Sequence, residues 1–386
     1  MSKSIELIIG GDLFPNETNE KLFIAGTTEE LVGTEIANKI NSADFRIFNL
    51  EGALTNLKSP ISKSGPIISA AEESINGIKK LKTDLLVLSN NHILDEGQIG
   101  IERTISVLNN NKISYIGIGK TEKERRNPFI FEKDGIKVGI YNCCEHEFSI
   151  TEEGFYGANP YDPLYVFDDV RTLNKNCDFV IVLFHGGKEY IRYPSPNIQR
   201  IFRKFAECGA NAVIAQHTHC IGSDEEFNNS LLLYGQGNFL FDTEISEFTN
   251  TGLLIKFSFY TDKTFTYEYI PVCKNNNVTR IATDEEKNTI LTELDNRSKK
   301  ILEPDFLKKV YTNNATEYLR GYLLNMHIGT KIDTILLRIF LLLPYKMQKK
   351  FFKKFENKLL ALLNYFNCES HRELIQKGLK TLLKVD

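Results

Sequence analysis

The sequence predicts an α/β protein in which two packed sheets are covered by helices. Apolar runs alternate with amphipathic stretches over residues 5–120, which indicates βαβ units and a mostly parallel sheet. A hairpin and further strand-like runs follow as far as residue 272, which indicates antiparallel pairing as well. From about residue 284 the chain has helical periodicity only, so a C-terminal helical region follows the sheets.

The first part of the chain supplies the alternating elements. The runs IELIIGG (5–11) and FRIFNLEG (45–52) are short, apolar and end in glycine, as buried strands do. The stretches 72–82 and 97–110 have the apolar spacing of amphipathic helices. Each helix precedes another strand, DLLVLSN (84–90) and ISYIGIG (113–119).

The second part begins with a hairpin, PFIFEKDGIKVGIYN (128–142), whose Asp134–Gly135 pair is a turn sequence. CDFVIVLFHGG (177–187) and ANAVIAQH (210–217) are buried strands that flank a helix over 197–209, with Gly209 as its C-cap. We expect consecutive antiparallel strands in LLLYGQGNFLFD (231–242), TGLLIKFSFY (251–260) and FTYEYIPV (265–272). The charged stretch 284–303 is helical. The predicted domains are 1–275 and 280–386.

Composition narrows the function classes. The net charge of −3 lacks the excess of positive charge that is typical of nucleic-acid-binding proteins. The seven cysteines form no CxxC pair, which argues against a disulfide framework and fits a reducing compartment. The N-terminal apolar stretch is too short for a signal peptide, and no run reaches the ~18 apolar residues of a spanning helix. The expected location is cytoplasmic, with a peripheral place at the inner face of the membrane left open by the C-terminal region.

The segment 328–366 combines Leu, Ile and Phe with clustered lysines, and Pro344 interrupts any helix there. Such a basic amphipathic stretch can lie on an anionic membrane or a partner, although an ordinary helical subdomain with a solvated lysine face is the favoured interpretation. Membrane contact predicts that liposomes with acidic lipid sediment the full-length protein and not a tail-deleted one. Equal sedimentation would refute it. The lysines are Lys346, Lys349, Lys350, Lys353 and Lys354.

Polar side chains cluster at the carboxyl ends of five predicted strands, where open α/β sheets bind ligands. Carboxylate, amide and imidazole groups without a thiolate suit Mn, Fe or Zn better than Ca or a structural zinc. Each residue alone is more often structural: Asp12 can be a cap, and the asparagines can form turns. The ordered set nevertheless predicts one or two divalent metal ions. Its members are Asp12, Asn49, Glu51, Asn90, Asn91, His92, His185, His217 and His219.

These segments resemble the CapA-type poly-γ-glutamate capsule synthesis proteins, which belong to the calcineurin-like metallophosphoesterase superfamily. The resemblance covers about residues 5–270. It implies a four-layer αββα metallophosphoesterase-like sandwich with the metal site on loops at one sheet edge. The matching segments are GGDLF (10–14), NLEGALT (49–55), LSNNHILDEGQIGIERTISVL (88–108), HGGKEYIRYPSP (185–196), GANAVIAQHTHCIG (209–222) and YGQGNFLFD (234–242).

The resemblance also implies roles. Asp12 and His219 would hold one metal ion, and Asn91, His185 and His217 the other, with Glu51 bridging the two. His92 would protonate the leaving group. Superfamily phosphatases usually have a D-x-H motif where this chain has Asp12, Leu13 and Phe14, so the first ion lacks an imidazole here. CapA-type proteins share this difference.

Three residues are candidates for binding substrate or orienting the ligands: Asn49 from the set above, and Lys188 and Glu189. Surface or structural roles are as common for such residues. The run Arg125–Arg126 can contact an anionic substrate, but a solvated charge run is the favoured interpretation.

Two functions follow from these observations. The first is a metal-dependent hydrolase or transferase in capsule or cell-envelope polymer biosynthesis, which uses metal-activated water on a phosphoester or an amide such as a γ-glutamyl bond. Its partner is an anionic polymer, or a phosphorylated or γ-glutamyl substrate, and not nucleic acid. The alternative is a catalytically inactive factor of the same fold that binds or assembles the polymer.

Overall fold

The computed structural model describes residues 3–63, 66–241, 246, 248–275, 278–314 and 338–348. The chain divides into two compact units, Met1–Leu307 and Lys308–Asp386, and the fold and the site described below belong to the first. This unit continues beyond residue 275 and includes the predicted helix α8 (Asp284–Ile301). Most of the basic stretch, including four of its five lysines, lies outside the described residues.

The first sheet is mixed, with the strand order β18-β17-β16-β1-β2-β5-β6. β1 lies at its centre, parallel to β2 and to β15 and antiparallel to β16. The parallel part carries the predicted βαβ pattern. The strands are β1 (Ser4–Phe14), β2 (Phe45–Leu50), β5 (Leu85–Val87), β6 (Ser114–Ile116), β15 (Asn238–Phe241), β16 (Thr251–Tyr260), β17 (Phe265–Asn275) and β18 (Val278–Ile281).

The second sheet has the order β13-β14-β12-β11-β9-β8. β9, β11, β12 and β14 run parallel, and an antiparallel strand flanks them on each side. The strands are β8 (Phe129–Lys133), β9 (Ile136–Cys144), β11 (Phe179–His185), β12 (Ala212–Gln216), β13 (Asp224–Phe227) and β14 (Ser230–Leu233). Two short pairs complete the strands: β3 (Ala53–Leu54) with β4 (Ser69–Ala70), and β7 (Ile118–Gly119) with β10 (Gly157–Ala158).

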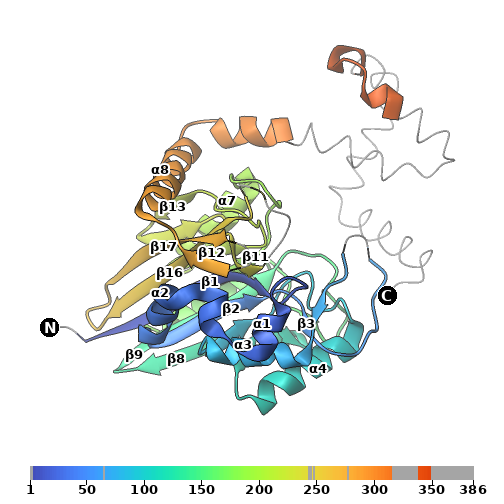
Figure 1. Ribbon diagram of the computed structural model, residues 1–386. Coiled ribbons are helices and arrows are strands. Elements are labelled where there is room, and N and C mark those ends of the chain that lie inside the picture. Colours follow the sequence, from blue (N-terminus) through green and yellow to red (C-terminus); the bar gives the residue numbers. More distant parts are fainter. Residues whose placement is uncertain are drawn as a thin grey trace. The chain divides into compact units, whose positions relative to one another are not determined.

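Three apolar cores separate four layers, and this confirms the predicted αββα sandwich (Figure 1). One core joins the first sheet to the helices α1 (Glu20–Ala25), α2 (Thr28–Ser42), α3 (Ile75–Lys80) and α4 (Gly97–Asn110). The middle core packs the inner faces of the two sheets. The third joins the second sheet to α6 (Val166–Asn176) and α7 (Pro196–Glu207). The short helices η1 (Glu72–Ser74) and α5 (Glu122–Arg125) lie in connections.

The hairpin prediction is confirmed, because β8 pairs antiparallel with β9 and both turn residues, Asp134 and Gly135, have positive φ. The prediction for LLLYGQGNFLFD is wrong. Its first half is β14, parallel to β12 in the second sheet, and its second half is β15, parallel to β1 in the first. The chain therefore crosses between the sheets here. Gly237, with φ 75°, permits the sharp change of direction.

The favoured interpretation of Arg125 and Arg126 as a solvated charge run is wrong. Arg125 is buried, and its guanidinium donates to the carbonyl oxygens of Gly119, Thr151, Glu152 and Phe155. Burial lowers its pKa from the usual value. Arg126 pairs with both carboxylate oxygens of Asp169. Arg125 thus holds two connections together, and Arg126 ties its connection to helix α6. Among the described residues, no helix is long and apolar enough to cross a bilayer.

Candidate metal centre

The two sheets present their polar strand ends to each other. Asp12 and Asn49 lie in β1 and β2 of the first sheet, Glu51 directly follows β2, and Asn91 lies in the loop after β5. His185 ends β11, and His217 and His219 follow β12 in the second sheet. Asp12 lies within β1 rather than after it, at a register shift between Ile9 and Asp12 that locally breaks the pairing with β2. All these side chains are buried.

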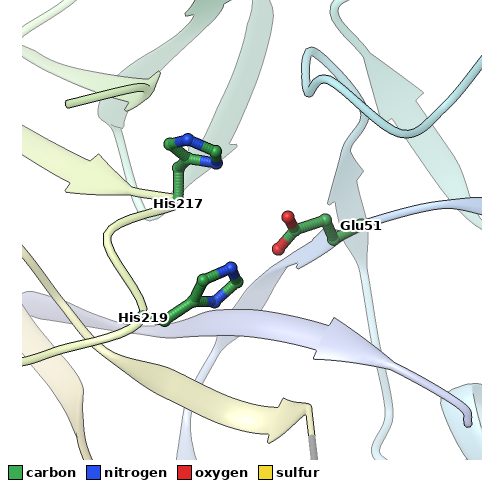
Figure 2. Close-up of side chains that lie close together, drawn as sticks. All are labelled: Glu51, His217 and His219. Carbon is green, nitrogen blue, oxygen red and sulfur yellow. The ribbon is translucent and has the colours of Figure 1, made fainter. Parts of the chain in front are cut away.

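Glu51 is the common member of two groups of potential ligand atoms. Its carboxylate groups with the imidazoles of His217 and His219, and separately with Asp12 and His185, and the ligand atoms of each group lie within 4.8 Å of one another. Figure 2 shows the first group, in which Glu51 comes from the segment that follows β2 and the two histidines come from the loop that follows β12. Glu51 therefore lies within reach of both groups, and its role as a bridge between two ions stays a prediction.

Glu51 also has an unusual environment. It is 0% exposed, and no hydrogen-bond donor contacts either of its carboxylate oxygens. The Asp12 carboxyl group lies within hydrogen-bonding reach, but the two groups can bond only if one of them is protonated. Burial raises its pKa well above the usual value, and the neighbouring Asp12 and Glu189 carboxylates raise it further. Burying an unpaired carboxylate is costly unless a cation accompanies it. A divalent ion beside Glu51 would oppose the rise in pKa that both effects cause, because its positive charge stabilises the ionised carboxylate.

Burial also raises the pKa of Asp12, although the nearby His219 and the hydrogen bonds from Asn49 and His217 oppose this effect. Asn49 Nδ2 donates to Asp12 Oδ1 at 2.7 Å, and the His217 backbone N–H donates to Asp12 Oδ2 at 3.1 Å. Nδ2 of Asn49 also lies 3.2 Å from His185 Nδ1. Because Asn49 is hydrogen-bonded to two candidate ligands, one from each sheet, it orients ligands in this arrangement.

His185 and Asn91 converge on one point. His185 Nε2 lies 3.0 Å from Asn91 Oδ1 and 3.7 Å from Glu51 Oε1. Nδ1 of His185 lies next to the amide donor of Asn49, so Nε2 faces Asn91 Oδ1 and Glu51 Oε1. Burial holds the pKa of His185 well below its usual value, and the neighbouring His217 lowers it further. The imidazole is therefore neutral, which is the form that binds metals.

His217 and His219 both have left-handed backbones, with φ 87° and φ 53°. This conformation is strained for a non-glycine residue and is concentrated at functional sites. His217 Nδ1 is buried without a hydrogen-bond partner, and burial lowers the pKa of His217 to about 3. His219 Nδ1 lies 2.8 Å from Asn238 Oδ1, which fixes the ring as the outer partner of a metal-binding histidine does.

His92 lies in the loop before α4. Its Nδ1 is 2.7 Å from Asp95 Oδ2, so Asp95 supports His92. The other Asp95 oxygen accepts from Lys63 Nζ, and the Ile68 backbone N–H donates to Asp95 Oδ2 at 2.9 Å. Asp95 therefore also ties the 55–68 connection to the site. Lys63, whose side chain is buried against Asp95, was not predicted, because a lysine in a long connection carries no sequence signal.

The remaining candidates lie at the edge of the centre. Glu189 Oε1 is 4.0 Å from His217 Nε2 and partly exposed, whereas Lys188 is exposed. A small pocket adjoins the histidines, and Glu145 and Glu147 line it beside Asn91, His185 and His217. Sequence reasoning also missed Asn238, whose only signal was an asparagine at the start of an apolar run.

The residues fit a divalent metal ion. The unpartnered Glu51 oxygens and His217 Nδ1 are buried donors that need a cation, and the neutral imidazoles beside carboxylates suit Mn, Fe or Zn. The division of the remaining ligands between two ions stays a prediction.

Comparisons with known proteins bear on this centre. The model of the family described as "Bacterial capsule synthesis protein PGA_cap" matches residues 6–243, which contain every candidate ligand. The "Capsule biosynthesis protein CapA" of Bacillus anthracis is 29% identical over 45% of this chain and 44% of its own length. The "PGA biosynthesis protein CapA" of Bacillus subtilis (strain 168) is 23% identical over 60% of this chain and 62% of its own. The chain thus matches less than two thirds of either relative.

Solved structures give weaker similarity. A hypothetical protein from Thermus thermophilus matches 69% of this chain and 98% of its own, with 12% identity and a TM-score of 0.43. Vps29 of Chaetomium thermophilum matches 70% of this chain and 100% of its own, with 8% identity and a TM-score of 0.25.

Proposed function

Because the chain belongs to the bacterial capsule synthesis protein family PGA_cap, we propose that it is a metal-dependent hydrolase or transferase that acts on a capsule or cell-envelope polymer or its precursor. The polymer is poly-γ-glutamate or a polysaccharide, and the bond is an amide or a phosphoester. One observation carries the proposal: the buried Glu51 carboxylate, which no hydrogen-bond donor contacts, lies in both groups of potential ligand atoms. A purely structural carboxylate would be paired.

In this proposal Asp12, Glu51, Asn91, His185, His217 and His219 hold one or two divalent ions. A bound ion supplies Lewis-acid chemistry, in which it activates water and stabilises negative charge in the transition state. Asn49 keeps Asp12 and His185 oriented through its amide group. His92, held by Asp95, delivers a proton to the leaving group. Glu189 orients His217 from the exposed side.

Metal analysis of the purified protein by inductively coupled plasma mass spectrometry tests the proposal. We expect two ions per chain after reconstitution with Mn, Fe or Zn, and a lower content in both Asp12→Ala and His217→Ala. His146→Ala is the control, because His146 is an exposed histidine outside the ligand groups.

The other outcomes are equally informative. One ion, lost only in His217→Ala, would indicate that the site lacking the D-x-H imidazole is degraded and that a single ion acts. If the reconstituted protein retains no metal, the proposal fails, and a non-catalytic polymer-binding factor becomes the better description.

A further inference from the structure

Ten described residues other than glycine have positive φ. Seven of them are Lys, Asp or Asn in turns, and Tyr190 also lies in a turn, which the Ile191 backbone N–H closes by donating to the Lys188 carbonyl oxygen at 3.2 Å. The other three carry rings and lie together: His217, His219 and Tyr190. A left-handed ring residue costs roughly 1–3 kcal/mol, so three at one place indicate a function that maintains the strain. The two histidines are candidate metal ligands, which leaves Tyr190 to be explained.

Tyr190 is fixed to the histidine loop. Its backbone N–H donates to the carbonyl oxygen of Thr218, the residue between the two histidines, at 2.9 Å. Its ring centroid lies 5.9 Å from that of His219 and 6.4 Å from that of Phe248. The ring therefore lies directly beside the candidate metal centre.

Core packing accounts for only part of the surface of this ring. Tyr190 is 43% exposed, so much of its apolar surface gains nothing from the core. The strained backbone (φ 60°) instead holds this partly exposed ring beside His219. Exposed loop aromatics beside a reaction centre are typical contact surfaces for ligands, because a tyrosine offers a large rigid face at a low cost in conformational entropy.

We propose that Tyr190 is a substrate-positioning residue, whose ring packs against the C–H face of the polymer repeat unit next to the reacting bond. This inference rests on the proposed function of the centre. Lys188, exposed on the same loop, supplies a positive charge for the carboxylate of an acidic repeat unit. The ligand class is therefore an acidic repeat unit with an apolar face, which a γ-linked glutamate and a uronate sugar both offer.

The composition of the chain makes a direct test possible, because it contains no tryptophan. A Tyr190→Trp variant keeps an aromatic ring and carries one fluorophore beside the centre. We expect its emission to change when short γ-linked oligoglutamate or a uronate-containing oligosaccharide is added to the full-length, metal-reconstituted protein, and the responding probe identifies the polymer class. Tyr165→Trp is the matched control, since Tyr165 is 36% exposed and packs on Arg126, outside the centre.

Removing the ring measures its contribution. Tyr190→Asn keeps a residue that tolerates positive φ, and we expect it to bind the responding probe about tenfold more weakly in equilibrium dialysis, whereas Tyr190→Phe binds like the wild type. Metal content should be unchanged in both variants.

Equal affinity of Tyr190→Asn and wild type, or an equal emission change in Tyr165→Trp, would overturn the proposal. Failure of the wild type to bind either probe would overturn it as well. The metal content of the wild type is measured independently, so loss of the positioning role and loss of the metal centre remain distinguishable.

Discussion

Glu51→Gln is expected to remove the metal and lower turnover by ~10³-fold or more, while the metal-free protein becomes more stable than the metal-free wild type. Gln has nearly the same shape as Glu but no charge to hold a cation. Without metal, the wild type must either bury two repelling carboxylates, Glu51 and Asp12, or take up a proton there at a cost, because both groups have raised pKa values. The neutral amide relieves this repulsion and can donate to Asp12, which we expect to be worth about 1 kcal/mol.

Glu225→Gln is the matched control for the expected gain in stability of the metal-free protein. Glu225 is also buried, but its carboxylate accepts two hydrogen bonds from Arg203, at 2.9 and 2.7 Å, and one from the Tyr234 hydroxyl at 2.6 Å. Breaking this paired network should destabilise the protein by about 2 kcal/mol, with or without metal. Urea unfolding with a chelator, and again with Mn²⁺, measures both effects. If chelated Glu51→Gln were as unstable as Glu225→Gln, Glu51 would be a structural residue.

Two substitutions of His217 should separate the effect of its backbone conformation on stability from the effect of its imidazole on metal binding. Both His217→Ala and His217→Gly are expected to lose metal and turnover, because each removes the imidazole. At φ 87°, however, only glycine is unstrained. We therefore expect the Gly variant to be more stable than the Ala variant by roughly 1–2 kcal/mol, the reverse of the usual order inside regular structure.

Lys263 gives the comparison, since it also has a left-handed backbone (φ 66°) but lies in the turn between β16 and β17. Lys263→Gly should likewise exceed Lys263→Ala in stability, with metal content and turnover unchanged. Thermal or urea unfolding together with metal analysis tests all four variants. If the Ala and Gly variants of His217 were equally stable, the backbone there would be unstrained in solution.

The sequence predicts the fold best where one segment determines its own structure. The helix predicted over 97–110 is α4 (Gly97–Asn110), and the Asp134–Gly135 turn specifies its hairpin locally. The crossing between β14 and β15 was not predictable in this way. Both halves of LLLYGQGNFLFD are equally apolar, so neither half indicates its sheet. They join different sheets because they pair with β12 and β1, two strands that lie far apart from each other in the chain.

The same distinction applies to the site. Residue type and position at strand ends are enough to predict Asp12, Glu51 and the histidines as metal ligands. Their supporting contacts depend on tertiary structure, as for Asn238 beside His219 or Lys63 against Asp95. The strain at Tyr190 is also invisible in the sequence, since φ is set by the loop and its bond to Thr218.

The division of the ligands between the two sheets has a consequence for folding. Asp12 is the first candidate ligand in the sequence and His219 the last. The segment between them contains nearly all the strands from β1 to β12. Contacts of such high sequence separation form late, after the intervening loops have closed. An ion that needs ligands from both sheets binds the completed fold and not its precursors. Metal supply would then slow unfolding without speeding folding, and metal retention would report that a chain has finished folding.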